Sequence, residues 1–136
     1  MRVVLDTNIL ISALINPHGT PASLLDAWRQ GRFELITSKE QLLELGAVAR
    51  RPQLRHYITP ARAGRFINDL RLLARVVNRL PLVDRSADPG DNFLLAMAQE
   101  GRADFLVTGD KRDVLALATH GDTRIVSARE MLKWLP

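Results

Sequence analysis

The sequence contains no cysteine, and this absence excludes several kinds of site at once. Disulfide bonds, thiolate zinc sites, iron–sulfur clusters and cysteine nucleophiles all require the missing side chain. No hydrophobic run approaches the roughly 20 residues that a membrane span needs, and the apolar run after Met1 is too short for a signal peptide. We therefore expect a cytoplasmic protein that makes no use of a membrane.

The common phosphate-binding and nucleophile motifs are absent as well. The chain has neither a G-x-x-x-x-G-K-[ST] phosphate loop nor a G-x-G-x-x-G dinucleotide fingerprint. No serine lies in the G-x-S-x-G context of a nucleophile elbow. The histidines are isolated and lack the spacing of metal ligands: His18, His56 and His120. The candidates for catalysis are therefore the carboxylates.

The composition that remains is that of an ordinary globular domain. The 136 residues are 46% hydrophobic and 25% charged, which is typical of a folded protein. A chain of this length buries about two-thirds of its unfolded surface and needs no disulfide or metal to fold. No internal repeat, low-complexity tract or linker interrupts it. We expect one domain over residues 1–136.

Positive charge is concentrated in one stretch of the chain. Lys and Arg number 19 against 15 acidic residues, which gives a net charge of +4. Residues 50–79 hold eight arginines and one acid, so this stretch carries +7 and the rest of the chain −3. The asymmetry suits a protein that holds a polyanion with one region and gathers carboxylates in another. A solvated helix face is the alternative explanation of the same arginines.

Short apolar runs alternate with helical patterns along the chain. Strands are expected at 3–5, 33–37, 80–83, 104–108 and 124–126, of which 80–83 has the weakest pattern. Helices are expected at 9–14, 20–30, 39–51, 60–79, 91–98, 113–118 and 128–134. This alternation predicts a parallel sheet covered on both faces. The predicted fold is a three-layer α/β domain.

Two helix starts carry clear capping signals. Ser38 followed by Gln41 predicts a capping box, in which each side chain satisfies a backbone N–H. Thr59 and Pro60 open the next helix. Its apolar positions follow i, i+4, i+7 and i+11: Phe66, Leu70, Leu73 and Val77. Three arginines are expected on another face of that helix: Arg71, Arg75 and Arg79.

Four carboxylates come at or near the ends of the predicted strands. Asp6 directly follows the first strand, and Asp110 closely follows the fourth. Glu44 and Asp91 lie in the helices after the second and third strands. In open α/β sheets the functional crevice lies outside the carboxyl ends of the strands, so the four acids are expected to converge. Such a cluster suits a hard divalent cation, Mg²⁺ or Mn²⁺, that can activate water and stabilise a phosphoryl oxygen.

Each acid also has a purely structural interpretation. Asp6 and Asp91 are candidate helix N-caps. Glu44 is a candidate solvated helix residue beside Glu40. The remaining acids of these segments are turn or capping candidates: Asp88, Asp110 and Asp113. The joint arrangement, rather than any one acid, favours a metal site.

Five segments match a known family in order and spacing. They are VLDTNIL at 4–10, LEL at 43–45 with RRP at 50–52, DPGDN at 88–92, ADFLVTGDK at 103–111 and RIVSARE at 124–130. In these segments the chain resembles PIN domains, specifically the VapC-like toxins of bacterial toxin–antitoxin systems. The resemblance spans nearly the whole chain, although no single motif would be specific.

The resemblance implies a Rossmann-like sheet of about five parallel strands and a Mg²⁺- or Mn²⁺-dependent endoribonuclease. Carried over position by position, the catalytic and metal-binding acids are Asp6, Glu44, Asp91 and Asp110, with Asp113 in support. The groups expected to orient carboxylates and water are Thr7, Asn8 and Thr108. Family members often form homodimers and are inhibited by a small antitoxin.

The leading hypothesis is therefore a metal-dependent endoribonuclease, the toxin of a type II toxin–antitoxin pair. The arginines predicted on its RNA path are Arg50, Arg51, Arg71, Arg75 and Arg79. An inactive PIN-fold module that binds RNA or protein is the main alternative. A haloacid dehalogenase-type phosphatase also places an aspartate after its first strand, but it needs a second aspartate two residues later, where this chain has Asn8.

Overall fold

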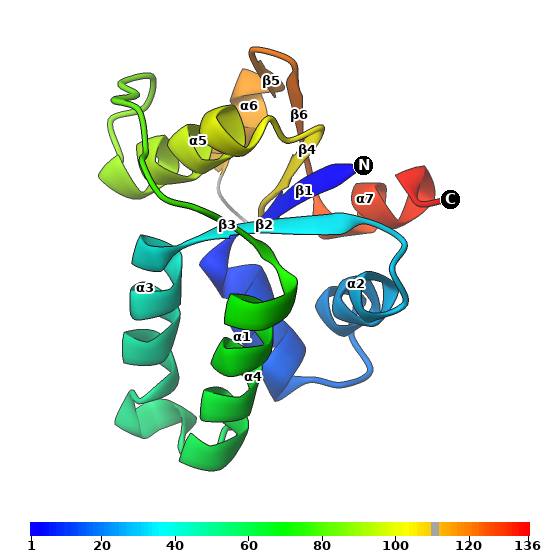
Figure 1. Cartoon of the computed structure of the whole chain (residues 1–136), viewed down its shortest axis with the longest axis vertical. Helices are drawn as coiled ribbons and strands as arrows, with labels where there is room; N and C mark the ends of the chain where they lie inside the picture. The colour runs from blue at the N-terminus through cyan, green and yellow to red at the C-terminus, as the bar shows by residue number, and fades with distance from the viewer. Residues whose placement is uncertain (110–111) are drawn as a thin grey trace.

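A six-stranded sheet forms the centre of the structure, a computed structural model that describes residues 1–109 and 112–136. The strands are β1 (Arg2–Leu5), β2 (Glu34–Ser38), β3 (Arg75–Val77), β4 (Phe105–Val107), β5 (Thr119–His120) and β6 (Thr123–Val126). Their order across the sheet is β3-β2-β1-β4-β6-β5 (Figure 1). Five of the six are parallel, and β5 pairs antiparallel with β6. The predicted α/β class with a mostly parallel sheet is confirmed.

Helices cover both faces of this sheet. They are α1 (Thr7–Ile15), α2 (Thr20–Arg29), α3 (Lys39–Ala49), α4 (Pro60–Leu73), α5 (Pro89–Gly101), α6 (Arg112–Leu117) and α7 (Ala128–Trp134), with a 3₁₀ turn η1 (Pro52–Leu54). Helices α1 to α4 and α7 pack on one face, and α5 and α6 on the other (Figure 1). Because side chains alternate along a strand, Val3 and Leu5 enter the first core and Val4 the second. No helix of the described residues is long and apolar enough to cross a membrane.

The sheet has a topological switch point at its centre. Strand β1 lies between β2 and β4, so the chain moves outward from β1 in one direction and later returns to its other side. At such a point the loops leave the carboxyl ends of the strands in opposite directions and open a crevice. Asp6 follows β1 and Thr108 follows β4. The fold therefore places these two residues side by side at the position where α/β proteins bind ligands.

The predicted helix starts are largely confirmed. The hydroxyl of Ser38 accepts a hydrogen bond from Gln41 N at 3.1 Å, and that of Thr59 accepts from Arg62 N at 3.2 Å. The second half of the predicted capping box is wrong. The Gln41 amide instead donates to the carbonyl of Leu5 at 2.8 Å and accepts from the hydroxyl of Thr37 at 2.7 Å.

The third strand is not where the sequence predicted it. Residues 80–83 form no strand, and β3 lies at Arg75–Val77, inside the segment predicted as helix. Helix α4 ends at Leu73, after which the backbone is extended and pairs with β2. Val77 is buried as predicted, but on the α5 face of the sheet, whereas Phe66 and Leu70 pack on the other face. The regular spacing of apolar residues thus continues past the end of α4, so the sequence pattern does not show where the helix ends.

Candidate active site

Asp6 is buried at the carboxyl end of β1, with 1% of its surface exposed. Its Oδ1 accepts a hydrogen bond from the backbone N of Asn8 at 2.6 Å, so it is the N-cap of α1. Its Oδ2 accepts from the hydroxyl of Thr108 at 2.9 Å. The capping interpretation of Asp6 is therefore correct, but it accounts for one carboxylate oxygen. The other oxygen is oriented from the neighbouring strand β4.

Of the three residues predicted to orient carboxylates, two contact Asp6. Thr108 does so through its fully buried hydroxyl, and Asn8 does so through its backbone N–H rather than its side chain. Thr7 is also buried, and with Asp6 and Asn8 it lines a cavity of about 30 Å³. The loop after β1 thus contributes three consecutive residues to one small hollow.

Glu44 reaches the same cavity from α3. Its side chain is exposed, and it lines the cavity together with Asp6 and with three residues of α5: Gly90, Phe93 and Leu94. Asp6 and Glu44 therefore line the same cavity. The two acids differ in environment, since one is held by hydrogen bonds in the interior and the other extends from a helix surface.

Asp91 lies in the first turn of α5 and is 2% exposed. Its Oδ2 accepts a hydrogen bond from the hydroxyl of Ser86 at 2.9 Å. The N-cap of α5 is Asp88, which accepts from the backbone N of Gly90 at 2.8 Å. The capping interpretation of Asp91 is thus wrong, and the residue treated as an ordinary turn aspartate performs that role. A carboxylate in the first turn is also favoured by the helix dipole.

Ser86 was not predicted as a site residue. Its loop is held by two side chains, those of Asn92 and Arg85. Asn92 accepts from the backbone N of Arg85 and of Ser86, and donates to the carbonyl of Ser86 at 2.8 Å. Arg85 in turn donates to the carbonyl of Thr119 and contacts Nδ1 of His120, both at 2.9 Å. Partial burial and the charge of Arg85 lower the pKa of His120. The loop before α5 is therefore tied both to its own helix and to the β5–β6 hairpin.

Two of the predicted acids cannot be placed from the structure. Asp110 lies outside the described residues, and so does the side chain of Asp113. Among the side chains that are described, no three of Asp, Glu, His or Cys lie close enough to hold one ion. The convergence of all four acids therefore stays a prediction, with Asp6 and Glu44 sharing one cavity and Asp91 next to its lining residue Gly90.

The donors at this cavity fit a hard divalent cation. Asp6 and Glu44 offer carboxylate oxygens, and the neighbouring Thr7 and Asn8 offer further oxygens of neutral side chains. Oxygen donors of this kind suit Mg²⁺ or Mn²⁺ better than zinc or copper. A volume of about 30 Å³ is enough for one or two water-sized species. Asp6 and Glu44 are the two described carboxylates that line this cavity and could hold such an ion.

The arginines do not form the single helical stripe that was predicted. Arg71 lies on α4, Arg75 on β3 and Arg79 beyond β3, because α4 ends at Leu73. Arg50 caps the end of α3, where its Nε donates to the carbonyl of Gly46 at 3.0 Å, and Arg51 follows it. All five are exposed.

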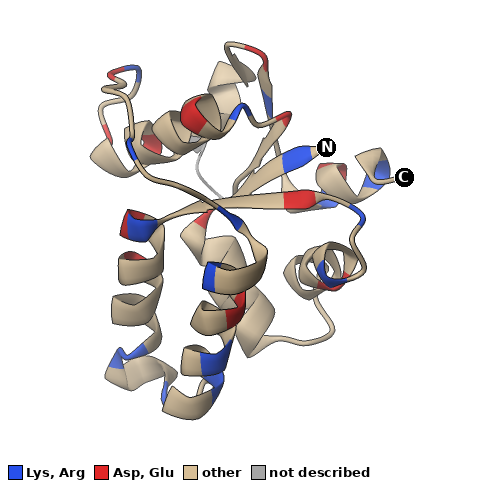
Figure 2. Ribbon diagram, viewed as in Figure 1, with Lys and Arg blue, Asp and Glu red and all other residues tan. Residues whose placement is uncertain are grey.

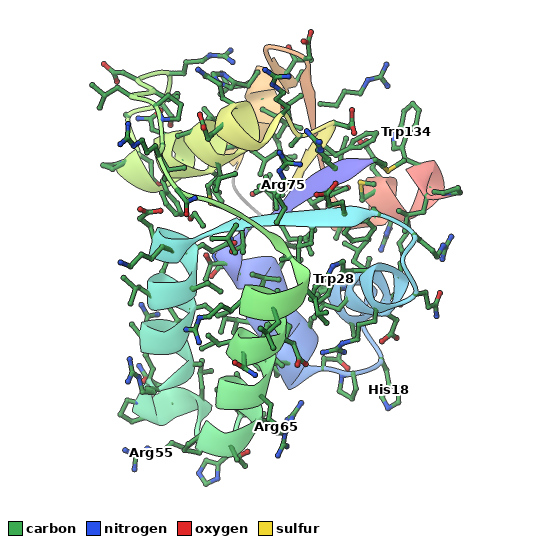
Figure 3. All side chains as sticks on the ribbon, viewed as in Figure 1. His18, Trp28, Arg55, Arg65, Arg75 and Trp134 are labelled. Carbon is green, nitrogen blue, oxygen red and sulfur yellow. The ribbon has the colours of Figure 1, made fainter. Side chains whose placement is uncertain are left out.

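The basic residues instead lie on α4, on the turn between α3 and α4, and on β3 and the residues after it. Figure 2 shows basic residues on α4 and on the turn between α3 and α4, whereas α3 itself carries one lysine and two glutamates. Arg55 and Arg65 lie at the end of these two helices farthest from the sheet, whereas Arg75 lies on the sheet itself (Figure 3). Arg75 forms a 3.7 Å ion pair with Glu34, and exposed pairs of this kind contribute little to stability. The surface is basic, but it is broader than one row of side chains.

The family model described as PIN domain matches residues 2–112 of the chain. The chain belongs to the PIN domain family. The resemblance noted in the sequence is thereby confirmed, and PIN domains are typically nucleases that use divalent metal ions. The uncharacterized protein MJ1680 of Methanocaldococcus jannaschii is 33% identical over 118 residues, which cover 86% of this chain and 75% of that protein.

Two solved structures have the same PIN fold. PAE2754 from Pyrobaculum aerophilum aligns with a TM-score of 0.63 at 19% identity, over 98% of this chain and 88% of its own. VapBC2 from Rickettsia felis, bound to a DNA fragment from their promoter, aligns with a TM-score of 0.61 at 14% identity, over 93% of this chain and 98% of its own. At these identities the likeness establishes the fold.

Proposed function

We propose that this PIN domain is a Mg²⁺- or Mn²⁺-dependent endoribonuclease whose catalytic acids are Asp6, Glu44, Asp91 and Asp110. The observation that carries the proposal is the position of Asp6. It is buried at the switch point of the sheet, hydrogen-bonded through both carboxylate oxygens, and shares a small cavity with Glu44. A structural cap needs only one of those oxygens.

The chain's own residues would divide the work as follows. Thr108 holds Oδ2 of Asp6 in one orientation, and Ser86 does the same for Oδ2 of Asp91. A divalent ion bound among the acids would supply the activation of water and the neutralisation of phosphoryl charge. Asp113 would support the acids as an accessory ligand. The exposed arginines of residues 50–79 would hold the RNA backbone by its phosphates.

We further propose a cytoplasmic toxin whose whole length, residues 1–136, forms one PIN domain. The proposed partners are a second copy of the chain and a small antitoxin. Membership of the PIN family and the shared fold with VapBC2 support this context. The check is whether an adjacent gene encodes a small DNA-binding protein that co-purifies with this chain and blocks its RNA cleavage. Stable association with no effect on cleavage would contradict the inhibitory role.

The test of the activity is cleavage of a labelled single-stranded RNA with Mg²⁺ or Mn²⁺ and with EDTA. We expect cleavage by the wild type only with metal, and a loss of more than about 100-fold in Asp6→Asn and Asp91→Asn, because even outer-sphere groups of metal sites contribute 10–100-fold. Glu44→Gln, on the exposed acid, should have the mildest effect.

Asp104→Asn is the matched control for these variants. Its Oδ2 accepts a hydrogen bond from Arg2 N at 2.7 Å at the opposite end of the sheet, and an amide oxygen can still accept it. This variant should cleave within twofold of the wild type. If the wild-type protein binds RNA but cleaves it with neither Mg²⁺ nor Mn²⁺, the nuclease proposal is contradicted and an inactive binding module is favoured.

A further inference from the structure

The side chain of Gln41 makes contacts that its predicted capping role does not explain. Its Nε2 donates to the carbonyl of Leu5 at 2.8 Å, and its Oε1 accepts from the hydroxyl of Thr37 at 2.7 Å. A carbonyl can only accept, so the amide nitrogen must face Leu5 and the amide oxygen must face Thr37. The orientation of this amide is therefore fixed by its partners.

The side chains of Gln41 and Thr37 are both inaccessible to water. Gln41 is 1% exposed and Thr37 is not exposed at all. Burying an amide is unfavourable unless its donors and acceptors are paired. An apolar side chain at this position would leave the buried carbonyl of Leu5 and hydroxyl of Thr37 without these partners. The buried amide therefore points to a role in fixing geometry.

The hydrogen bonds of Gln41 connect the segments that carry two of the proposed catalytic acids. Leu5 is the last residue of β1 and directly precedes Asp6. Gln41 lies on α3 three residues before Glu44, a spacing that puts two side chains on the same side of a helix. Thr37 lies near the end of β2, between these two elements in the chain. One hydrogen bond thus joins the strand that leads to Asp6 to the helix that carries Glu44.

Apolar packing alone would hold α3 less exactly in place. The residues of α3 that enter the core include Leu42, Leu45 and Ala49, and hydrophobic contacts have no directional preference. A directional bond of 2.8 Å to Leu5 restricts both the sliding and the rotation of the helix. The distance between the carboxylates of Asp6 and Glu44 depends on that placement.

We propose that Gln41 is a positioning residue: its amide, oriented by Thr37, sets the separation of Asp6 and Glu44 and thereby the affinity of the site for a divalent cation. This inference rests on the proposed metal-dependent function. It adds a residue that touches neither the cation nor the RNA.

The test is the dissociation constant for Mn²⁺, measured from the electron paramagnetic resonance signal of free Mn²⁺. Gln41→Met keeps the length of the side chain and removes both hydrogen bonds. Its dissociation constant should rise by about 10-fold or more, the scale of outer-sphere substitutions. Thr37→Val leaves the bond to Leu5 but removes the hydroxyl that orients the amide, so a smaller rise is expected. This second variant carries the test if Gln41→Met does not fold.

Thr123→Val is the control for the loss of a buried hydrogen bond. Thr123 is 3% exposed and donates to the carbonyl of Ala103 at 2.7 Å, far from α3 in the sequence. It should lower the melting temperature while leaving the Mn²⁺ affinity within twofold of the wild type. Raising the Mn²⁺ concentration should restore most of the cleavage rate of Gln41→Met, because the defect lies in binding the ion.

The possible failures can be told apart. If the wild type binds Mn²⁺ but Gln41→Met and Thr37→Val bind it equally well, Gln41 only stabilises the fold and the inference is overturned. If neither the wild type nor Asp6→Asn binds Mn²⁺, the proposed function fails, and the role of Gln41 fails with it.

Discussion

The carboxyl edge of the central strands and the basic surface formed by α4 and the α3–α4 turn arrange their polar groups in opposite ways. At the edge, Asp6, Thr108 and Gln41 are almost fully buried, and each is held by hydrogen bonds of 2.6 to 2.9 Å. On the basic surface, Arg50 at the end of α3 and Arg71 on α4 are exposed. A buried polar group must be paired, so its direction is fixed, whereas an exposed charge acts over roughly 10 Å without a fixed geometry.

This difference matches the two tasks of the proposed enzyme. Bond cleavage needs carboxylates placed to within a fraction of an ångström, and the edge provides Asp6 and Asp91 as buried, hydrogen-bonded carboxylates. Holding a polyanion of variable sequence needs charge rather than geometry, and the helices provide it. Substitutions at the edge should therefore change catalysis, and substitutions on the helices should change salt-dependent binding.

Among the variants that compare the sheet edge with the basic surface, Thr108→Val is expected to have the largest effect. It removes the hydroxyl that donates to Oδ2 of Asp6 and keeps the shape of the side chain. We expect a 10- to 100-fold slower metal-dependent cleavage and a decrease of roughly 1–3 kcal/mol in the free energy of unfolding, because the buried acceptor no longer has its donor. Rate measurements and urea titration give the two numbers.

Thr123→Val separates these two effects. It breaks an equally buried threonine hydrogen bond, to Ala103 at the other end of the sheet. Its stability should fall by a similar amount while its cleavage rate is retained. Equal rate losses in both variants would mean that Thr108 acts only through stability.

A smaller effect, on binding alone, is expected from the double change Arg50→Gln with Arg71→Gln. If both arginines bind phosphates, the slope of log affinity against log salt should fall by roughly 0.7 to 1 unit for each arginine replaced. The cleavage rate at saturating RNA should stay close to that of the wild type. Arg102→Gln with Arg129→Gln removes the same charge from the C-cap of α5 and from α7, and should leave the slope nearly unchanged. Identical slopes for the two pairs would show that the α3–α4 arginines are only a solvated face.

The smallest effect is expected at Gly46, within α3. A Cβ added there would meet Ile67 at 3.5 Å and Arg50 at 3.7 Å, which are ordinary contacts. Gly46→Ala should therefore raise the free energy of unfolding by roughly 0.4–1 kcal/mol through helix propensity and a restricted unfolded chain. In the packed core the outcome should reverse. At Gly101 a Cβ would lie 2.6 Å from Ile36, so Gly101→Ala should lower the melting temperature.

Local sequence patterns predicted much of the fold, because strand and helix-capping signals extend over only a few residues. The strand before Asp6, the cap at Ser38 and the start of α4 at Pro60 were all predicted correctly. The end of α4 was missed, because the pairing of Arg75–Val77 with β2 decides it. That pairing joins residues about 40 positions apart, which no local pattern contains.

The same limit applies to the site. Asp6 was singled out because it follows the first predicted strand. Thr108 was predicted as the last residue of its strand, and its role came from the resemblance to PIN domains. The partners that orient the acids were harder to find. Ser86 lies in an irregular loop, and the bond between Gln41 and Leu5 spans 36 residues. A capping signal at Gln41 even favoured another role for its side chain, since the carbonyl that it contacts lies 36 residues away in the sequence.

The central claim is that the acids at the sheet edge form a cation site, and the most direct measurement is the melting temperature with and without Mg²⁺. Bound metal stabilises the folded state by mass action, so Mg²⁺ should raise the melting temperature of the wild type and do so much less for Asp6→Asn. Without metal, Asp6→Asn should melt at the same or a higher temperature, because asparagine is an equally good N-cap and removes a repelling charge. A metal-free Asp6→Asn that melts well below the wild type, and that responds to Mg²⁺ as the wild type does, would show that Asp6 is only a structural cap.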